Sequence, residues 1–225
     1  MHHRTVADLM TTEVVRVRGD TPFKDVVRQL AEHRVGAVPV VDAAGRVIGV
    51  VSEADLLPKT ADRPDAAGLV PLPDVPAWDL VRAEGSRAEE LMSAPAVCAR
   101  PEWGVVEAAR LMTAQNVKRL PVVDGADRLV GVISRSDVLR VFLRRDEEIR
   151  EEIRADVLAD ALGIASSVTA EVHDGRVALT GTVPDPALVT LAERLCHAVD
   201  GVVAVDTRIT VGAKTPGTAA GPRRR

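Results

Sequence analysis

Two serine–aspartate pairs are the residues of this chain whose types and spacing best suit ligand binding. Ser52 precedes Asp55 by three positions, and Ser134 precedes Asp137 by the same spacing. Each serine follows an apolar, strand-like run, so its hydroxyl and the next backbone N–H groups would lie at a helix start, which suits a phosphate. The carboxylate three residues later can accept both hydroxyl groups of a ribose. These residue types and their spacing are therefore compatible with a ligand that carries a phosphate and hydroxyl groups.

The same spacing also has an explanation that needs no ligand. In a capping box, a serine caps the helix and an acidic residue three positions later accepts a hydrogen bond from the backbone N–H of the cap. Capping alone would account for both pairs. Ligand binding and helix capping therefore remain open alternatives at this stage.

Both pairs lie in two copies of one longer segment. Residues 35–57 read VGAVPVVDAAGRVIGVVSEADLL, and residues 117–139 read VKRLPVVDGADRLVGVISRSDVL. Pro39 aligns with Pro121 at the same 82-residue separation as the two serines, with no insertion between the copies. A gapless repeat predicts one structural unit that is built twice, with the two units stacked on a shared face.

The hydrophobic pattern predicts a β-α-β-β-α order in each copy. In the first copy we expect a helical lead-in over residues 5–10, a strand over 14–17, a helix over 22–33, a hairpin over 38–41 and 46–51, and a helix from 52 to 57. The second copy repeats this order from residue 88, with its long helix over 105–115 and its hairpin over 120–123 and 128–133. The predicted fold class is α/β (α+β), with two pseudo-symmetric units packed as a pair.

A proline-rich linker separates the copies, and a smaller domain follows them. Trp78 in the linker is expected to dock on a neighbouring surface or, alternatively, to stack on a ligand. From residue 146 the pattern predicts helix, hairpin, helix and strand, with Leu188, Leu191, Leu195 and Ala198 on the buried face of the second helix. The predicted domains are residues 1–58 (first repeat), 59–86 (linker), 87–145 (second repeat), 146–212 (a small α-β-β-α-β domain) and 213–225 (a disordered tail).

Composition limits the classes of function. The formal net charge of −4, with 28% charged residues, argues against a protein that coats nucleic acid, so a nucleic-acid partner is not expected. Cys98 and Cys196 lie far apart without a CxxC partner, which fits a reducing compartment. The chain has no signal-peptide pattern and no apolar run of about 18 residues, so we expect a cytoplasmic protein. No catalytic constellation, phosphate-binding loop or metal-ligand cluster is found, which indicates a non-enzymatic protein without a catalytic cofactor or metal.

Each copy resembles a CBS domain, the module named for cystathionine β-synthase. The residues that carry the resemblance are PVVD at 39–42 and 121–124, the G-x-x-S-x-x-D segments at 49–55 and 131–137, and Leu-Met at 9–10 and 91–92. The resemblance implies paired domains around a pseudo-two-fold axis, with two equivalent clefts for AMP, ADP, ATP or S-adenosyl methionine. It also implies a homodimer formed through the CBS pair.

The resemblance assigns a role to each candidate residue. Ser52 and Ser134 would face the phosphate or ribose, and Asp55 and Asp137 would hold the ribose hydroxyls. The base pockets would be lined by Ala37, Val38 and Pro39 in one copy and by Arg119, Leu120 and Pro121 in the other.

The copies differ where Gly36-Ala37 of the first becomes Lys118-Arg119 in the second. Two cations beside one base pocket would favour a charged nucleotide in the cleft that Arg119 borders. The alternative is a solvated basic pair on a strand edge.

The C-terminal part resembles a BON domain through GRVALTGTV at 175–183 and GVVAVDTRITV at 201–211, with Gly181 in the strand. This resemblance implies binding to a lipid surface or a macromolecule. We therefore expect a regulator that binds an adenosyl ligand in its repeats and relays binding through the C-terminal domain. The alternative is a ligand-independent scaffold whose C-terminal domain binds a protein partner or an anionic membrane surface.

Overall fold

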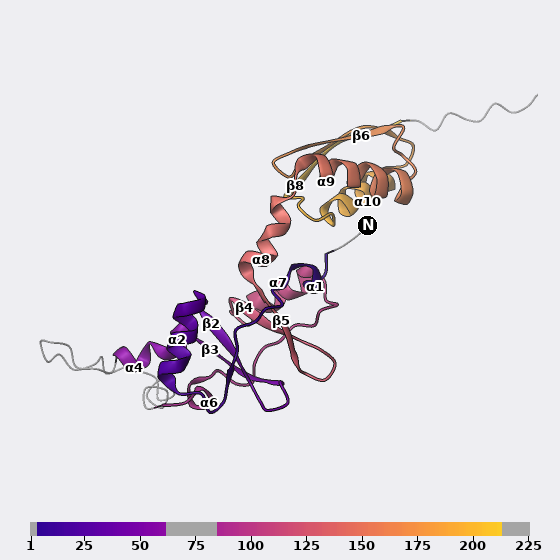
Figure 1. The fold of residues 1–225 in the computed structure, drawn as a ribbon. Coiled ribbons are helices and arrows are strands. Elements are labelled where there is room, and N and C mark those ends of the chain that lie inside the picture. Colours follow the sequence, from indigo (N-terminus) through magenta and orange to yellow (C-terminus); the bar gives the residue numbers. More distant parts are fainter. Residues whose placement is uncertain (1–3, 62–84, 213–225) are drawn as a thin grey trace, which may run out of the picture. The chain divides into compact units, whose positions relative to one another are not determined.

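The computed structural model describes residues 4–61 and 85–212 and divides them into two compact units. One unit runs from Arg4 to Val138 and contains both repeats, and the other begins at Leu139 (Figure 1). The expected position of Trp78 and the expected disordered tail fall outside the described residues. We describe each unit separately.

The two repeats contain the same elements in the same order. The first has α1 (Val6–Leu9), β1 (Val17–Arg18), α2 (Phe23–His33), β2 (Ala37–Val41), β3 (Val47–Ser52), α3 (Glu53–Leu56) and α4 (Pro58–Ala61). The second has α6 (Ala88–Leu91), α7 (Val105–Ala114), β4 (Arg119–Val123), β5 (Leu129–Ser134), α8 (Arg135–Leu139) and the 3-10 turn η1 (Arg140–Leu143). The predicted pair of mixed helix and strand units is confirmed.

The two hairpins have equivalent registers. Ala37 pairs with Ser52 in the first, and Arg119 pairs with Ser134 in the second. Both hairpins also shift register at the same place, between Val40 and Val41 and at the corresponding position 82 residues later. The register thus brings one base-pocket candidate of each copy, Ala37 or Arg119, beside a candidate serine.

The first strand of each repeat differs from the prediction. The strand expected over residues 14–17 is displaced to Val17–Arg18, where it pairs in parallel with β2. In the second repeat, only an isolated bridge from Ala99 to Val122 remains. Pro101 stands where the first repeat has Gly19, and proline has no N–H with which to extend the ladder.

Each lead-in helix packs into the core of the other repeat. Ala88 and Leu91 of α6 belong to the first repeat's core, and Val6 of α1 belongs to the second repeat's core. An isolated bridge follows each lead-in, from Ser93 to Val50 and from Thr11 to Val132. This exchange makes the two repeats one folding unit.

The exchange also explains the paired Leu-Met and glycine motifs. Met92 lies over Gly49, and Met10 lies over Gly131, so that a Cβ atom at either glycine would collide with the methionine side chain. A larger residue at either position would therefore force the methionine side chain to move.

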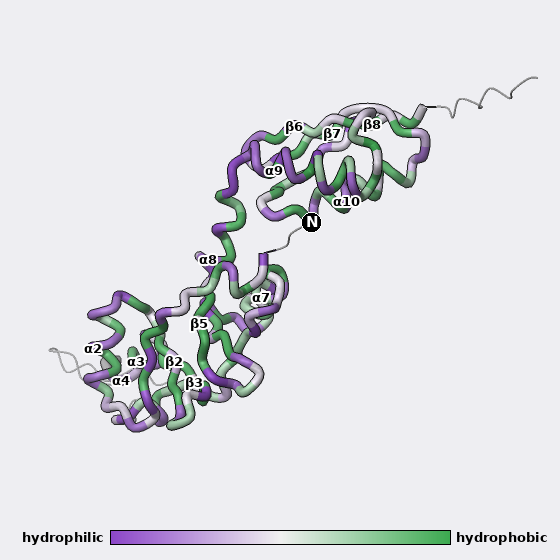
Figure 2. Tube along the Cα trace, turned by 45° about the vertical axis from the view of Figure 1, so that its right-hand side comes forward, coloured by the Kyte–Doolittle hydropathy of each residue, from purple (hydrophilic) through white to green (hydrophobic). Residues whose placement is uncertain are grey.

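The C-terminal unit has two helical segments on one face of a three-stranded sheet (Figures 1 and 2). Its elements are α9 (Asp146–Glu152), the π-helix η2 (Ile153–Ala161), β6 (Val168–His173), β7 (Arg176–Val183), α10 (Pro186–His197) and β8 (Ala204–Val211). The strand order is β6-β7-β8, antiparallel and then parallel. The expected α-β-β-α-β order is confirmed.

The expected buried face of α10 is partly wrong. Leu191 is 42% exposed, and Ala198 is exposed as well. The fully buried positions are Ala192 and Cys196, whose small side chains let the helix approach the sheet. Among the described residues, no helix is long and apolar enough to cross a bilayer.

Candidate ligand-binding site

A cavity of about 360 Å³ lies between the two repeats and contains four of the ten candidate residues. Ala37, Ser52 and Asp55 come from the first repeat, and Arg119 comes from the second. The rest of the wall includes Val50, Ser93, Pro95, Val97 and Val117. The cavity is therefore built from the helix start of one repeat and the strand edge of the other.

Ser52 and Asp55 are positioned by the junction of β3 and α3. The Asp55 Oδ2 atom accepts hydrogen bonds from the Ser52 backbone N–H at 2.8 Å and from its hydroxyl at 2.6 Å. These bonds form the capping box that the spacing allowed. Asp55 is only 7% exposed, and among the described residues only Asp137 is a similarly buried charged side chain.

Ser93 connects the second repeat to this carboxylate. Its hydroxyl donates to the Asp55 Oδ1 atom at 3.0 Å. Each carboxylate oxygen of Asp55 therefore accepts a serine hydroxyl, one from each repeat. A carboxylate offers about four acceptor positions, so a ligand hydroxyl would share these oxygens with the serines.

Arg119, together with Lys118, supplies the positive charge of the cavity. Its Nη1 atom donates to the Ala37 carbonyl oxygen at 3.4 Å, and its Nη2 atom lies 3.2 Å from the position that a Cβ atom of Gly36 would occupy. The Glu53 carboxylate lies 3.1 Å from the same point. The absence of a side chain at Gly36 thus lets the guanidinium of the second repeat reach the first.

The second serine–aspartate pair has the same local geometry. Asp137 Oδ2 accepts from the Ser134 backbone N–H at 2.9 Å and from its hydroxyl at 2.5 Å. Neither residue lines the cavity that contains Arg119. In the repeat alignment, Thr11 takes the place of Ser93, and Glu13 takes the place of Pro95. The two copies therefore differ in the residues that follow their Leu-Met motifs.

The remaining candidates lie beneath the cleft rather than on its wall. Val38 and Leu120 are fully buried in the cores of the two repeats. Pro39 and Pro121 pair with Val50 and Val132 inside the hairpins. The cavity wall includes none of these four residues.

The sequence reasoning missed Ser93. The sequence did mark this position, because a hydroxyl residue follows the Leu-Met motif in both copies, Thr11 in the first and Ser93 in the second. Only the exchange of lead-in helices places that position against the opposite repeat.

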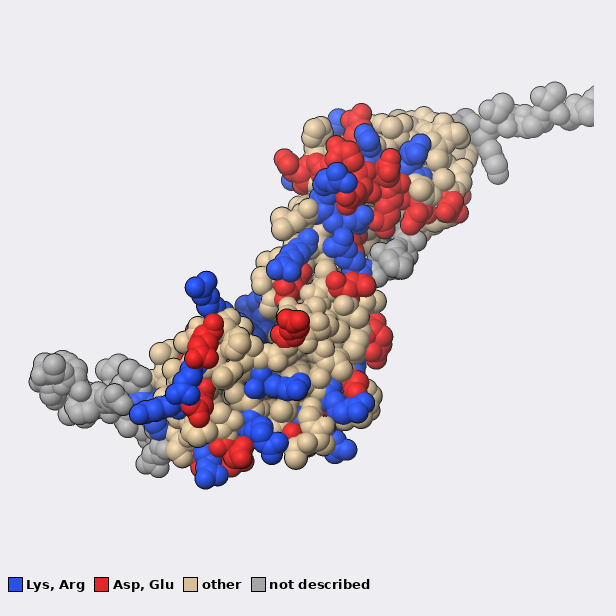
Figure 3. Space-filling view, viewed as in Figure 1, with Lys and Arg blue, Asp and Glu red and all other residues tan. Residues whose placement is uncertain are grey.

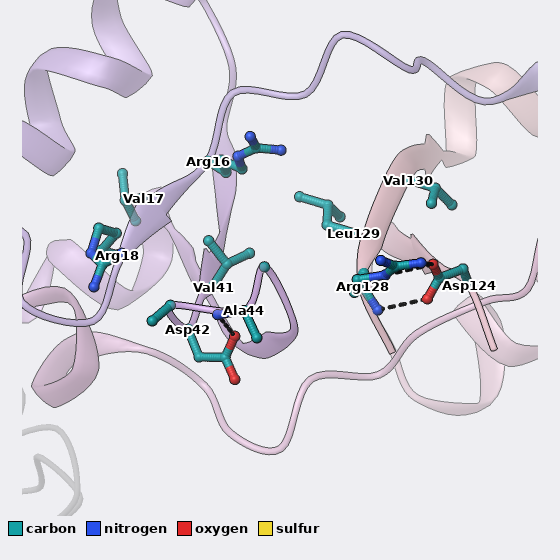
Figure 4. A pocket seen from close by; sticks show the side chains of 12 residues that line it. Arg16, Val17, Arg18, Val41, Asp42, Ala44, Asp124, Arg128, Leu129 and Val130 are labelled. Atoms are coloured by element: carbon teal, nitrogen blue, oxygen red, sulfur yellow. Dashed lines mark hydrogen bonds and ion pairs between the residues drawn. The ribbon is translucent and has the colours of Figure 1, made fainter. Parts of the chain in front are cut away.

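A second, wider cavity of about 600 Å³ lies between the turns of the two hairpins (Figure 4). At least two of its charged side chains already interact with groups in their own turns. Arg128 forms an ion pair with Asp124 at 2.8 Å, and Asp42 accepts a hydrogen bond from the Ala44 backbone N–H at 2.8 Å. None of the ten candidate residues lines it.

Neither cysteine is an activated nucleophile. Burial raises the pKa of the Cys98 thiol, and burial raises the pKa of Cys196 to about 12. A thiol reacts as its thiolate, so both are inert near neutral pH. In the described part of the chain, no group of three or more His, Cys, Asp or Glu side chains is placed to hold a metal ion.

Comparison with known proteins places both units in described families. A family model for the CBS domain matches residues 6–61 and 88–144, and a model for the BON domain matches residues 145–213. An uncharacterized protein of Methanocaldococcus jannaschii is 28% identical over 153 residues, which cover 61% of this chain and 90% of that protein. The chloroplastic CBS domain-containing protein CBSX2 of Arabidopsis thaliana is 30% identical over 156 residues, or 64% of this chain and 66% of CBSX2. The crystal structure of CBSX2 in complex with AMP superposes with a TM-score of 0.52 and 29% identity over 62% of this chain and 96% of that one.

Proposed function

Because this chain belongs to the CBS domain family and carries a BON domain after its two CBS domains, we propose that it is a non-enzymatic regulatory protein whose CBS pair binds an adenosyl ligand. The observation that carries this proposal is the cavity that brings Ser52, Asp55 and Arg119 together from both repeats. The similarity to CBSX2, whose structure holds AMP, supports an adenine nucleotide.

The chemistry of the wall suits a mononucleotide. Arg119 and the neighbouring Lys118 would neutralise the phosphate, and Asp55 would accept ribose hydroxyls. Apolar side chains that line the same cavity, Val50, Val97 and Val117, would contact the adenine. A volume of about 360 Å³ lies near the lower end of small-molecule pockets, which favours AMP over a larger ligand.

The regulatory step follows from the position of the cavity. A ligand that contacts both repeats would bind one packing of the CBS pair more tightly than another, and it would shift the equilibrium by that difference in affinity. The BON domain would pass this shift to a partner. We include in the proposal a homodimer formed through the CBS pair and a cytoplasmic location.

A second candidate function rests on the hydrogen bonds of Asp55. Since Ser52 and Ser93 already satisfy both carboxylate oxygens, the site is stable without a ligand. The chain would then be a scaffold whose BON domain does the binding. Figure 3 shows acidic side chains gathered over α9, which begins with Asp146, Glu147 and Glu148. This face favours a basic protein partner over an anionic membrane.

The test is isothermal titration calorimetry of the full chain with AMP, ATP and S-adenosyl methionine. We expect AMP to bind and Arg119→Ala to weaken it by about tenfold, because the variant removes one charge-assisted contact. Arg128→Ala is the matched control, since it removes a guanidinium that lines only the other cavity. Absence of heat with all three ligands, or equal losses in the two variants, would refute the proposed site. Sedimentation with a basic protein that persists without ligand would favour the scaffold.

A further inference from the structure

Strand β8 has an unprotected edge. The sheet order β6-β7-β8 leaves its outer side without a partner strand among the described residues. Its eight residues, AVDTRITV, include no proline or lysine, and their two charged side chains, Asp206 and Arg208, form an ion pair with each other. Eight residues also exceed the common strand length of about five to six. Such an edge favours pairing with another strand.

On the side of β8 that is directed toward the helices, two valine side chains are exposed to solvent and one threonine hydroxyl lacks a hydrogen bond. Val203, just before the strand, and Val211, its last residue, are 57% and 51% exposed. Between them, the Thr207 Oγ1 atom is buried and has no hydrogen-bond partner. Because side chains alternate, these three residues share a face with Val205 and Ile209, which pack on the domain core.

One antiparallel register between β8 strands of two copies would cover both valines and bring the two Thr207 side chains together. If Thr207 faces Thr207 of a second copy, Val203 faces Val211 of that copy, and Val205 faces Ile209. On the opposite face, Asp206 faces Arg208, and the two-fold axis repeats this pair. The valine and isoleucine side chains on one face meet each other, Ala204 faces Thr210 on the other face, and each charge meets its opposite.

We propose that β8 pairs with β8 of a second copy of this chain around a two-fold axis at Thr207, which joins two BON domains into a continuous six-stranded sheet. The two threonine side chains meet at the axis, where rotation about χ1 allows one hydroxyl to donate to the other. The exposed ends Val203 and Val211 cover each other.

A second copy fits this edge better than a membrane or an unrelated strand. The outward face of β8 carries both Asp206 and Arg208, which form an ion pair at 3.0 Å, so it offers no uniform charge to a lipid surface. To pair with this edge, another strand needs a basic residue opposite Asp206 and an acidic residue opposite Arg208. A second copy of β8 that runs antiparallel provides both. The match is a property of the strand's own sequence.

This contact is separate from the dimer proposed through the CBS pair and does not depend on a ligand. Two different two-fold contacts on one chain either share an axis, which gives a closed dimer, or link dimers into larger assemblies. Loss of the β8 contact is therefore distinguishable from loss of adenosyl binding.

Cysteine cross-linking of the full chain tests the register. In Thr207→Cys, the two introduced thiols face each other within the Cα separation that a disulfide needs, so mild oxidation is expected to give a covalent dimer. Thr210→Cys is the matched control. Its two copies lie six residue steps apart, or about 20 Å, in this register. A dimer from Thr210→Cys, or none from Thr207→Cys, would overturn the proposal.

A charge exchange tests the contact without oxidation. Asp206→Arg and Arg208→Asp each place like charges opposite one another at two positions, so self-association measured by sedimentation is expected to weaken about tenfold. The double variant D206R/R208D restores opposite charges and is expected to recover association. Single variants that associate normally, or a double variant that fails to recover, would contradict the pairing. Circular dichroism of each variant confirms that the fold is retained.

Discussion

The hydrogen bond from Ser93 to Asp55 allows a quantitative test of how the two CBS domains are joined. Ser93→Ala removes a bond of 3.0 Å to the Oδ1 atom and leaves the capping bonds of Ser52 on Oδ2 intact. A net hydrogen bond contributes about 1 kcal/mol to the free energy of unfolding, so this variant is expected to lose about that amount. Asp55→Ala removes the cap as well, which adds about 1 kcal/mol and gives a loss of about 2 kcal/mol.

The double variant separates this contact from local effects. Without the Asp55 carboxylate, Ser93→Ala has no bond to remove, so its additional cost is expected to fall close to zero. The expected coupling energy is therefore about 1 kcal/mol. Urea unfolding of the four proteins, followed by circular dichroism at 25 °C, measures it. If Ser93→Ala costs the same with and without Asp55, the two repeats are not joined through this carboxylate.

Three further outcomes follow from the packing. Gly49→Ala is expected to cost about 2 kcal/mol in urea unfolding because its Cβ atom would collide with Met92, whereas Gly45→Asn in the open turn should cost much less. Arg144→Ala removes one partner of a mostly buried ion pair with Glu152 at 2.9 Å and is expected to cost about 3 kcal/mol; a loss no larger than that of the exposed Arg145→Ala would contradict this. Cys196, with its pKa of about 12, should resist iodoacetamide at pH 8 in the folded protein, and rapid modification detected by mass spectrometry would show that the thiol is not buried.

The sequence predicted local structure well where periodicity and turn chemistry agreed. Both hairpins of the repeats and the hairpin around Asp174 combine an apolar strand pattern with a turn, and all three formed as expected. The hydrogen bond from each serine N–H to its aspartate was also predictable from the three-residue spacing, although that spacing left ligand binding open as an alternative.

Features that depend on long-range packing were not readable. Leu191 has the same helical spacing as the partly buried Leu188 and Leu195, but α10 approaches the sheet through Ala192 and Cys196, so Leu191 faces outward. The cavity could not be assembled from either copy alone, because Arg119 joins Ser52 and Asp55 of the other repeat. Ser93 was missed for the same reason.

The number of ligands bound per chain tests the central claim most directly. Since the cavity with Arg119 joins Ser52 and Asp55, while Ser134 and Asp137 do not line it, we predict one AMP per chain in equilibrium dialysis of the full protein. Arg119→Ala should weaken this binding about tenfold, and Arg128→Ala should leave it unchanged. Two equal sites per chain, or no binding at all, would contradict the account.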